Sequence, residues 1–296
     1  MTSTRTCAVV SLFNPDDGVL ANAAALLSQV DHVVVVDDGS TQDPGRILAK
    51  LSAAGCTVER LHENSGIAAA LNRGIEIALS RADKPDYVLT MDQDSLLEDG
   101  YVRSLVEAAT AAAVQGIPVG LVAPGTVRGL PVRRRGTRLG VQLGGEPIQS
   151  GLLIPVPVVE QLGLFKADLF IDGVDTEYYL RCRNAGLETV LAPGAALNHS
   201  LGSSAPAQIM GRTLSLRGRN VNIRTAATWR YYYIFRNRIL LAKIYGLRHP
   251  GWAAKGFLAD FRHLLIVTAL APGRFPRLKS AWTGIADGLT GRTGKN

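Results

Sequence analysis

The chain has few of the residues that indicate a secreted protein or a zinc-stabilised one. Only three cysteines occur in 296 residues: Cys7, Cys56 and Cys182. Their wide spacing and odd number argue against a disulfide framework, and no Cys/His cluster has the spacing of a zinc site. The first residues contain no apolar signal region. We therefore expect a cytoplasmic protein with reduced thiols.

Long apolar runs are also lacking. The stretch 264–271 is too short to span a bilayer. No G-x-G-x-x-G follows a predicted strand, which disfavours a dehydrogenase. With 47% hydrophobic and 19% charged residues, the composition is typical of a globular protein long enough for one large domain, or for a domain with an appendage.

Acidic residues are almost absent from the C-terminal third. Residues 205–296 contain 16 Lys/Arg and only two acids, whereas residues 1–204 contain 16 Lys/Arg and 23 acids. This asymmetry predicts an acidic body over 1–204 and a basic, mainly helical region over 205–296. A basic region attracts anionic lipid, nucleic acid or phosphate-bearing ligands.

The body alternates apolar strand patterns with helical ones. Strands are predicted at 7–13, 32–36, 56–61 and 87–91, and helices at 17–27, 44–54, 67–81 and 100–115. This βαβα order predicts an α/β fold with a Rossmann-like, mostly parallel sheet and flanking helices. Such sheets bind ligands beyond the carboxyl ends of their strands.

Carboxylates follow two of the predicted strands at that edge. Asp37 and Asp38 come after a run of valines, and Asp92 and Asp94 end the apolar run that begins at Tyr87. Paired acids at a strand end are costly to desolvate, and a divalent cation relieves this cost. A polar turn is the alternative interpretation of each pair.

Three further segments carry candidate site residues. Asn64 and Gly66 precede a helix, where backbone N–H groups either approach a nucleotide or simply cap the helix. Asp175 lies at the mouth of a helix, so it is either a cap or a catalytic base. His199 follows a strand and is either structural or a metal ligand beside a carboxylate.

Four strings in order resemble a known family. VVVVDDGS, NSGIAAALNRG, DQD and FIDGVDTEYYLRCRNAG are similar to the motifs of inverting family 2 glycosyltransferases with the GT-A fold, over about residues 7–202. The form LFIDGVDTEYYLR, together with YYYIFRNRILL, most resembles the bacterial rhamnosyltransferase branch. That branch uses dTDP-L-rhamnose and builds cell-surface polysaccharide or glycolipid.

The resemblance implies a role for each candidate. Asp38 would bind the nucleobase or ribose, assisted by Asp37 or Asn64, with Gly66 in the adjoining loop. Asp92 would contact the ribose or sugar. The metal, Mg or Mn, would be held by Asp94 through the diphosphate and completed by His199. Asp175 would be the catalytic base. The family's usual Glu-Asp pair is Val174-Asp175 here, so Asp172 or Glu177 could share that role.

The basic region predicts a contact with another surface. Aromatic residues alternate with arginines over 229–245, a pattern that suits an anionic membrane surface and a glycan or lipid-linked acceptor at the inner face of the cell membrane. Core packing and a homodimer interface are the alternatives, and the absence of a nucleic-acid module disfavours nucleic acid. Residues 124–149 are predicted to form a mobile loop or irregular hairpin, and the Arg-rich stretch 128–138 within them either covers the donor or grips an acceptor phosphate.

Two competing functions remain open from the sequence. The chain could use a UDP- or GDP-sugar instead, since pocket details decide sugar choice. It could also be an inactive nucleotide-sugar or glycan-binding protein, which a donor-hydrolysis assay would reveal. Sugar-nucleotide synthesis is disfavoured because the first strand is followed by Asn-Pro-Asp-Asp-Gly rather than by a Gly-rich basic loop.

Overall fold

The structure is a computed structural model that describes residues 4–199, 203–209, 212–216 and 218–296. The chain divides into two compact units. The first comprises Met1–Ala167 and Val174–Ser200, and the second comprises Asp168–Gly173 and Leu201–Asn296. The short segment Asp168–Gly173 therefore belongs with the C-terminal part of the chain, not with the residues on either side of it.

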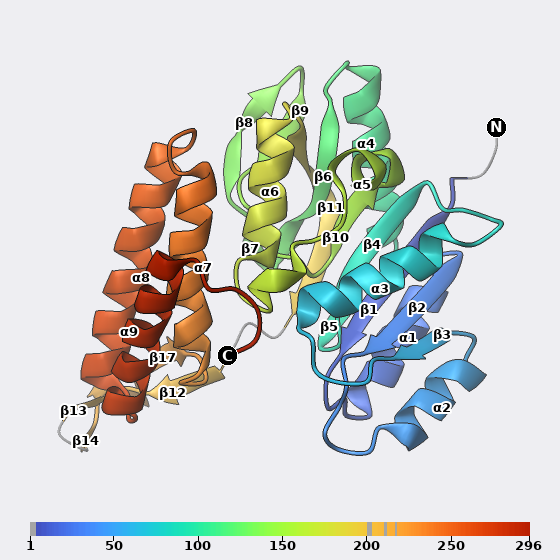
Figure 1. Ribbon diagram of the computed structural model, residues 1–296. Helices are drawn as coiled ribbons and strands as arrows, with labels where there is room; N and C mark the ends of the chain where they lie inside the picture. Colours follow the sequence, from blue (N-terminus) through green and yellow to red (C-terminus); the bar gives the residue numbers. More distant parts are fainter. Residues whose placement is uncertain (1–3, 200–202, 210–211, 217) are drawn as a thin grey trace. The chain divides into compact units, whose positions relative to one another are not determined.

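The first unit is built on one mixed sheet with the strand order β3-β2-β1-β4-β10-β6-β11-β9-β8 (Figure 1). Strands β1 to β4 run parallel to one another, whereas β10 is antiparallel to both of its neighbours. The strands are β1 (Thr6–Leu12), β2 (His32–Asp37), β3 (Thr57–Arg60), β4 (Tyr87–Asp92), β5 (Ser95–Leu97), β6 (Val119–Val127), β7 (Leu130–Pro131), β8 (Arg134–Arg138), β9 (Val141–Gly144), β10 (Leu152–Pro155) and β11 (Glu188–His199).

Helices cover both faces of this sheet, which explains why its central strands are apolar throughout (Figure 1). The helices are α1 (Gly18–Leu27), α2 (Gly45–Ala53), α3 (Ile67–Leu79), α4 (Tyr101–Val114), α5 (Val156–Leu162) and α6 (Val174–Asn184). Val10 and Leu12 of β1 pack in one core cluster with residues of α1 and α4. The alternate residue Val9 faces α3 so closely that a Cβ on Gly74 would lie 2.3 Å from its Cγ1.

The predicted mixed α/β fold is confirmed. Strand β6 is not among the predicted strands, because its Gly-Pro-interrupted sequence resembles a loop. The stretch 128–138 belongs partly to a hairpin of β8 and β9, so the hairpin alternative is correct. The side chains of Arg134–Arg138 are exposed.

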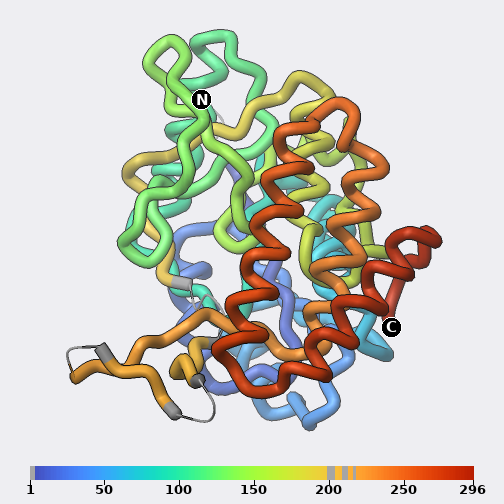
Figure 2. The backbone as a smooth tube through the Cα atoms, turned by 90° about the vertical axis from the view of Figure 1, so that its left-hand side faces the viewer, coloured from blue at the N-terminus to red at the C-terminus, as the bar shows by residue number. Residues whose placement is uncertain are grey.

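In its described residues the second unit consists of short hairpins followed by helices (Figure 2). Its helices are α7 (Arg230–Tyr245), α8 (Pro250–Leu270) and α9 (Arg274–Thr290). Helices α9 and α7 pack closely. A Cβ added at Gly284 of α9 would lie only 2.2 Å from the carbonyl oxygen of Tyr232 in α7. The hairpin strands are β12 (Ser203–Pro206), β13 (Gln208–Ile209), β14 (Arg212–Thr213), β15 (Ser215–Leu216), β16 (Arg219–Asn220) and β17 (Asn222–Thr225).

Two expectations for this region need correction. Helices were expected from residue 205 onward, but the described residues between 203 and 225 form these hairpins. The aromatic run of α7 is buried, with Tyr231, Tyr232 and Phe235 each at most 2% exposed. Core packing was therefore the correct alternative for α7, and the membrane contact stays a prediction that this helix does not support. No helix in the described part of the chain is long and apolar enough to cross a membrane.

Candidate active site

Two acidic strand ends lie on either side of β1 at one edge of the sheet. Strand β1 pairs with β2 in the register Leu12 to Asp37, and with β4 in the register Ser11 to Asp92. The carboxyl ends of these parallel strands are the edge at which open α/β sheets bind ligands. The structure thus brings the two acidic strand ends together, as the strand pattern predicted.

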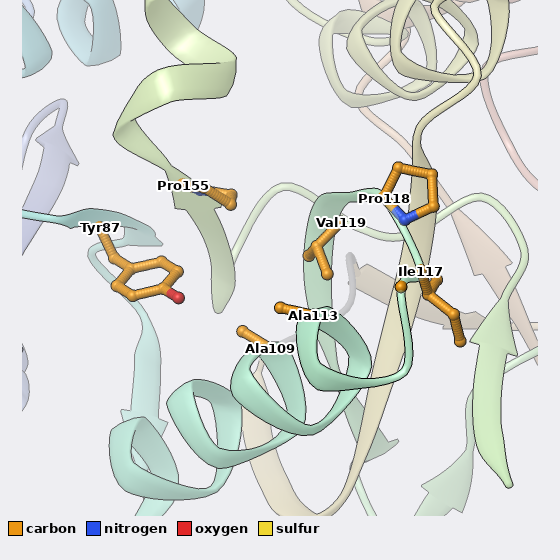
Figure 3. Close-up of a pocket in the computed structure, with 8 residues that line it drawn as sticks. Tyr87, Ala109, Ala113, Ile117, Pro118, Val119 and Pro155 are labelled. Atoms are coloured by element: carbon orange, nitrogen blue, oxygen red, sulfur yellow. The ribbon is translucent and has the colours of Figure 1, made fainter. Parts of the chain in front are cut away.

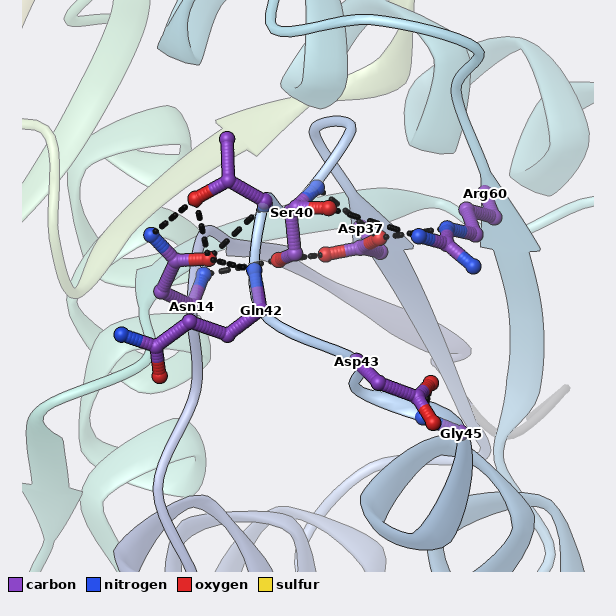
Figure 4. A network of polar contacts seen from close by, with 8 residues as sticks. Asn14, Asp37, Ser40, Gln42, Asp43, Gly45 and Arg60 are labelled. Atoms are coloured by element: carbon purple, nitrogen blue, oxygen red, sulfur yellow. Dashed lines mark hydrogen bonds and ion pairs between the residues drawn. The ribbon is translucent and has the colours of Figure 1, made fainter.

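Asp37 is fully buried and holds the loop that follows β2 (Figure 4). The hydroxyl of Ser40 donates a hydrogen bond to its Oδ1, and the Ser40 N–H donates to Oδ2 at 3.3 Å. Arg60 Nε lies 3.1 Å from the same Oδ2. A buried carboxylate needs both a paired charge and hydrogen-bond donors, and Asp37 has both. Its contacts are structural, and its part in nucleotide binding stays a prediction.

Asn14, two residues beyond β1, belongs to the same network (Figure 4). Its φ is 48°, in the left-handed region that Asn tolerates better than most residues. Its side-chain oxygen accepts the N–H of Thr41 at 2.9 Å and of Gln42 at 3.0 Å, while its own N–H donates to Ser40 Oγ at 2.7 Å. Asn14 is not among the site residues predicted from the sequence, although an Asn-Pro pair directly after a strand is a turn signal that points to it.

Asp38 joins this loop to the start of α3. Its Oδ1 accepts the Ser65 N–H at 2.7 Å, and its Oδ2 accepts the Gly66 N–H at 2.9 Å. Both donors precede the helix, where unsatisfied N–H groups and the helix dipole favour a negative charge. The carboxylate therefore acts as a cap from a neighbouring loop, and the predicted nucleobase contact remains a prediction.

The backbone of the two loops is in direct contact at Gly39. Its φ is +60°, and a Cβ there would lie 2.3 Å from the carbonyl carbon of Glu63 and 2.6 Å from the nitrogen of Asn64. Only glycine fits this approach. The structure thus brings together the segments of Asp37, Asp38, Asn64 and Gly66 that the sequence analysis singled out separately.

The Asp-Gln-Asp triplet is anchored to the rest of the edge by its first two residues. The Asp92 N–H donates to Ser150 Oγ at 3.0 Å, and its carbonyl accepts Asn22 Nδ2 at 2.9 Å. The amide of Gln93 bonds both backbone groups of Phe13, at 2.8 Å and 3.3 Å. Gln93 was not a predicted site residue, and these bonds give it the role of tying the end of β4 to the end of β1.

Asp94 is exposed and directly precedes β5. Strand β5 pairs with the end of β11, in a register that sets Ser95 opposite His199. The backbones of the two predicted metal ligands are therefore neighbours across this ladder. The side chain of His199 lies outside the described residues. Among the described residues, no group of three His, Cys, Asp or Glu side chains could hold a metal ion.

Asp175 is the second residue of α6 and is partly buried. Its Oδ1 accepts the N–H of Thr176 at 2.8 Å, and the Thr176 hydroxyl donates to Glu146. A carboxylate in the first turn of a helix is stabilised in its charged form by the helix dipole. These contacts are compatible with either alternative, a cap or a base.

The two acids that could share the base role are both held by arginine. Arg230 contacts the two oxygens of Asp172 at 3.1 Å and 2.5 Å. Arg181 contacts the two oxygens of Glu177, which is 3% exposed, at 3.2 Å and 2.5 Å. Two-point guanidinium contacts are strong and directional. Both acids therefore serve as structural ion pairs, which weakens the case for either as the base.

Residues 7–148 match the family model described as glycosyl transferase family 2. The chain contains a family 2 glycosyltransferase domain and is a glycosyltransferase. It is also 25% identical, over 309 aligned residues, to the dTDP-rhamnosyl transferase RfbF of Shigella flexneri, covering 97% of this chain and 96% of that protein. The family match includes the loops after β2 and β4 and ends before α6.

Solved structures support the GT-A fold of this glycosyltransferase. GalNAc-T7, solved with UDP, GalNAc and Mn²⁺, superposes with a TM-score of 0.54 at 14% identity, over 70% of this chain and 44% of that one. TarS of S. aureus gives 0.52 at 16%, over 67% and 37%. A TarS 1–349 structure gives 0.50 at 14%, over 97% and 92%. The chain thus spans less than half the length of the first two structures, and these likenesses bear on the fold alone.

A cavity of the glycosyltransferase lies elsewhere and does not fit a diphosphate (Figure 3). It has a volume of about 400 Å³ and is lined by Tyr87 and Val119, which begin parallel strands, and by residues such as Ala113 and Ile117. The cavity is therefore at the amino ends of these strands, opposite to the acidic edge. None of its lining residues is charged, so it offers nothing to neutralise phosphate.

Proposed function

We propose that this glycosyltransferase moves L-rhamnose from dTDP-L-rhamnose, with inversion, to a glycan or lipid-linked acceptor in the synthesis of cell-surface polysaccharide. The observation that carries the proposal is the meeting of two acidic strand ends, Asp37-Asp38 and Asp92–Asp94, at one sheet edge. The choice of donor rests on the similarity to a dTDP-rhamnosyl transferase over almost the whole chain, the C-terminal unit included.

The donor would lie across the loops that Asp38 and Gly39 hold together. Asp38 fixes the N–H groups before α3, and Gly39 allows the two loops to touch. Rigid loops are needed because only a preorganised pocket selects one nucleotide over another at low cost. Asp92, at the end of β4, is assigned to the ribose or the sugar.

A divalent cation, Mg or Mn, fits the donor set at Asp94. Such hard cations take oxygen ligands, and Mg in particular keeps several waters and uses one or two carboxylates together with substrate phosphates. Asp94 is an exposed carboxylate directly before β5, the strand that pairs with β11 at His199. One such carboxylate is sufficient when the substrate phosphates and water supply the other ligands. When bound, the cation would neutralise the charge on the departing nucleoside diphosphate.

Asp175 is the proposed base. It would accept the proton of the acceptor hydroxyl as that oxygen attacks the anomeric carbon in a single displacement. Its neighbours Asp172 and Glu177 are each held by an arginine in two-point contact, which weakens the case for either of them as the base. Replacing Asp175 should lower turnover and leave donor binding largely intact.

The donor is tested by thermal stability in the presence of dTDP-L-rhamnose, UDP-sugars and GDP-sugars, each with and without Mg or Mn. A ligand that binds only the folded protein raises the melting temperature by mass action. A metal-dependent rise with dTDP-L-rhamnose alone supports the proposal. A rise with another nucleotide sugar overturns the donor, and no rise with any donor favours an inactive glycan-binding protein.

The base is tested by the Asp175→Asn variant, with release of dTDP from dTDP-L-rhamnose as the readout. We expect turnover to fall at least about a hundredfold, the usual scale of general-base loss, with the donor-induced melting shift unchanged. Glu177→Gln, two residues further along α6, is the matched control, and it should keep its turnover. Near-normal turnover of Asp175→Asn would remove the base assignment and leave the donor proposal standing.

We further propose a peripheral location at the inner face of the cell membrane, where a lipid-linked acceptor would be met. The support now comes from α8, on which Leu258 and Leu265 are 71% and 69% exposed beside exposed Lys255 and Arg262. An apolar and basic helix face suits an anionic bilayer surface. The protein should sediment with vesicles that contain anionic lipid and less with neutral vesicles. Failure to sediment with anionic vesicles at low salt would overturn the proposed membrane location. The homodimer stays a prediction.

A further inference from the structure

The segment Asp168–Gly173, directly before α6, has an unusual backbone. Phe170, Asp172 and Gly173 have φ values of 66°, 59° and 92°. The left-handed region is uncommon for any residue but glycine and is a genuine outlier for a bulky aromatic one. Such a conformation persists only when the surroundings fix it. The contacts that fix this one come from α7 and the C-terminal tail, all within the second unit.

Asn237 of α7 binds three carbonyl groups of this segment. Its Nδ2 lies 3.0 Å from the oxygen of Leu169, 2.7 Å from that of Ile171 and 2.7 Å from that of Asp172. Its Oδ1 accepts a hydrogen bond from Arg236 Nε at 2.8 Å. Arginine only donates and carbonyls only accept, so the reversed amide would be repelled on both sides. The orientation of this amide is therefore fixed by its partners.

Arg236 is fully buried, and its guanidinium binds backbone oxygens. Its Nη2 donates to Leu169 at 2.8 Å, and its Nη1 donates to Gly294 in the C-terminal tail. Its guanidinium lies 5.3 Å and 4.8 Å from the ring centres of Tyr232 and Tyr233. Burying an arginine costs free energy unless its donors are hydrogen-bonded. The burial of Arg236 therefore depends on its hydrogen bonds to this segment and to the C-terminal tail.

We propose that Arg236 and Asn237 are positioning residues for the base, with Arg230 in support. By fixing the backbone over residues 169–172, they set the direction in which the chain enters α6. Asp175 is the second residue of that helix, so its carboxylate is aimed by contacts made some 60 residues later in the chain. The proposal rests on the proposed function, since it needs Asp175 to be the base.

The proposal explains why two separate motifs of the sequence occur together. FIDGVD supplies the strained segment and the base, and YYYIFRNRILL supplies the arginine, the asparagine and the tyrosine rings. The ring of Phe170 stacks on that of Tyr233, with centres 5.0 Å apart.

The test compares α7 variants on two faces of the same helix in the full-length protein. Asn237→Ala removes the donor to three carbonyls, and Arg230→Met removes the partly exposed ion pair with Asp172. The control is Arg238→Met, which breaks the ion pair with Asp260 at 2.7 Å. The readouts are release of dTDP from dTDP-L-rhamnose and hydrogen–deuterium exchange over residues 168–178.

We expect Asn237→Ala to lower kcat about tenfold with little change in KM for the donor, since small displacements of a catalytic group are costly. Exchange over 168–178 should become faster in Asn237→Ala and Arg230→Met but not in Arg238→Met. In the Asp175→Asn background, adding Asn237→Ala should give no further fall in kcat, because residues that act as a unit are not additive.

An equal further fall in that background would mean a purely structural role and overturn the proposal, as would an unchanged kcat in Asn237→Ala. If Asp175→Asn itself keeps its turnover, the base assignment and the positioning role both fail. If Asp175→Asn is inactive and Asn237→Ala fully active, only the positioning role fails. Should Asn237→Ala not fold, the pair Arg230→Met and Arg238→Met decides the question by the same two readouts.

Discussion

Two loops of this glycosyltransferase solve a similar problem with different partners. The loop after β2 turns at Gly39 and is held by side chains from its own strand end and from the ends of β1 and β3. The segment before α6 turns at Phe170, Asp172 and Gly173 and is held by α7 and the C-terminal tail. Local sheet topology supports the first loop, whereas contacts distant in sequence support the second.

The two loops should differ in the substitutions that they tolerate. The first loop packs backbone against backbone at Gly39, so a Cβ there has no room. The second relies on directional polar groups, and a Cβ on its single glycine, Gly173, would meet side-chain atoms of Leu241 and Asn237 rather than backbone. We therefore expect the first loop to be intolerant of added atoms and the second to be intolerant of lost hydrogen bonds.

The largest effect is expected for Gly39→Ala. The added Cβ would lie 2.3 Å from backbone at Glu63, so the loops after β2 and β3 must separate. Unfolding free energy should fall by about 3 kcal/mol or more, the range of severe steric changes, and the donor-induced melting shift should disappear. Thermal melts with and without dTDP-L-rhamnose measure both.

Gly129→Ala is the matched control for that variant. Its φ is +71°, but a Cβ there would meet nothing within 4 Å. Only the backbone strain remains, about 1–2 kcal/mol. If the two variants lose the same stability, close loop packing at Gly39 is not what holds the first loop.

The second-largest effect is expected for Glu177→Gln, which removes the negative partner of the Glu177–Arg181 ion pair in α6. Glu177 is buried against Arg181, whose Nη1 also donates to the carbonyl groups of Leu162 and Leu164 at 2.8 Å and 2.9 Å. Breaking a buried ion pair on one side leaves an uncompensated charge, and we expect a loss of about 3 kcal/mol. Denaturant unfolding measures it. Loss of turnover without loss of stability would instead make Glu177 part of the base.

A smaller effect is expected for Gly173→Ala in the second loop. The φ of +92° strains any residue with a Cβ, but the nearest atom, Leu241 Cδ1, is 3.3 Å away and can move. The cost should be about 1–2 kcal/mol, mostly backbone strain. Denaturant unfolding of Gly39→Ala and Gly173→Ala side by side checks the comparison. A larger loss for Gly173→Ala would reverse the account of which loop tolerates added atoms.

The sequence was sufficient for the first loop because its parts follow strands directly. Valine runs locate the strands, and Asp37, Asp38 and Asp92 occur where those strands end. The supporting residues Asn14 and Gln93 were missed, because a turn signal does not state which loop the turn will contact. Strand β6 was missed because its Gly-Pro content disguises it.

The second loop could not be predicted, because its support is tertiary. Nothing in the sequence indicates that Asn237 binds carbonyl groups near residue 170. The alternation of aromatic residues and arginines in α7 would also look the same whether the helix faced a membrane or buried an arginine against aromatic rings. Periodicity shows that a side chain repeats on one face, but not what that face meets.

The smallest expected effect concerns pH and the core of the second unit. Burial lowers the pKa of His263, which packs on Tyr231 with ring centres 5.9 Å apart. Arg277 and Arg224 lower this pKa further, and Asp260 opposes them. The unfolded chain therefore binds a proton at higher pH than the folded one does. Stability should be full above the ordinary histidine pKa of about 6.5 and should decline as pH falls through it.

Thermal melts of the wild type and of His263→Gln between pH 8 and about 5.5 measure this contribution, because the two proteins differ only at His263. The wild type should lose more stability on acidification than the variant does, by a margin smaller than any effect above. The donor-induced melting shift at each pH should be the same in both proteins, since His263 contacts Tyr231 of α7, within the second unit. If His263→Gln is the more acid-sensitive protein, protonated His263 stabilises the second unit, and its core is more polar than its buried aromatic residues imply.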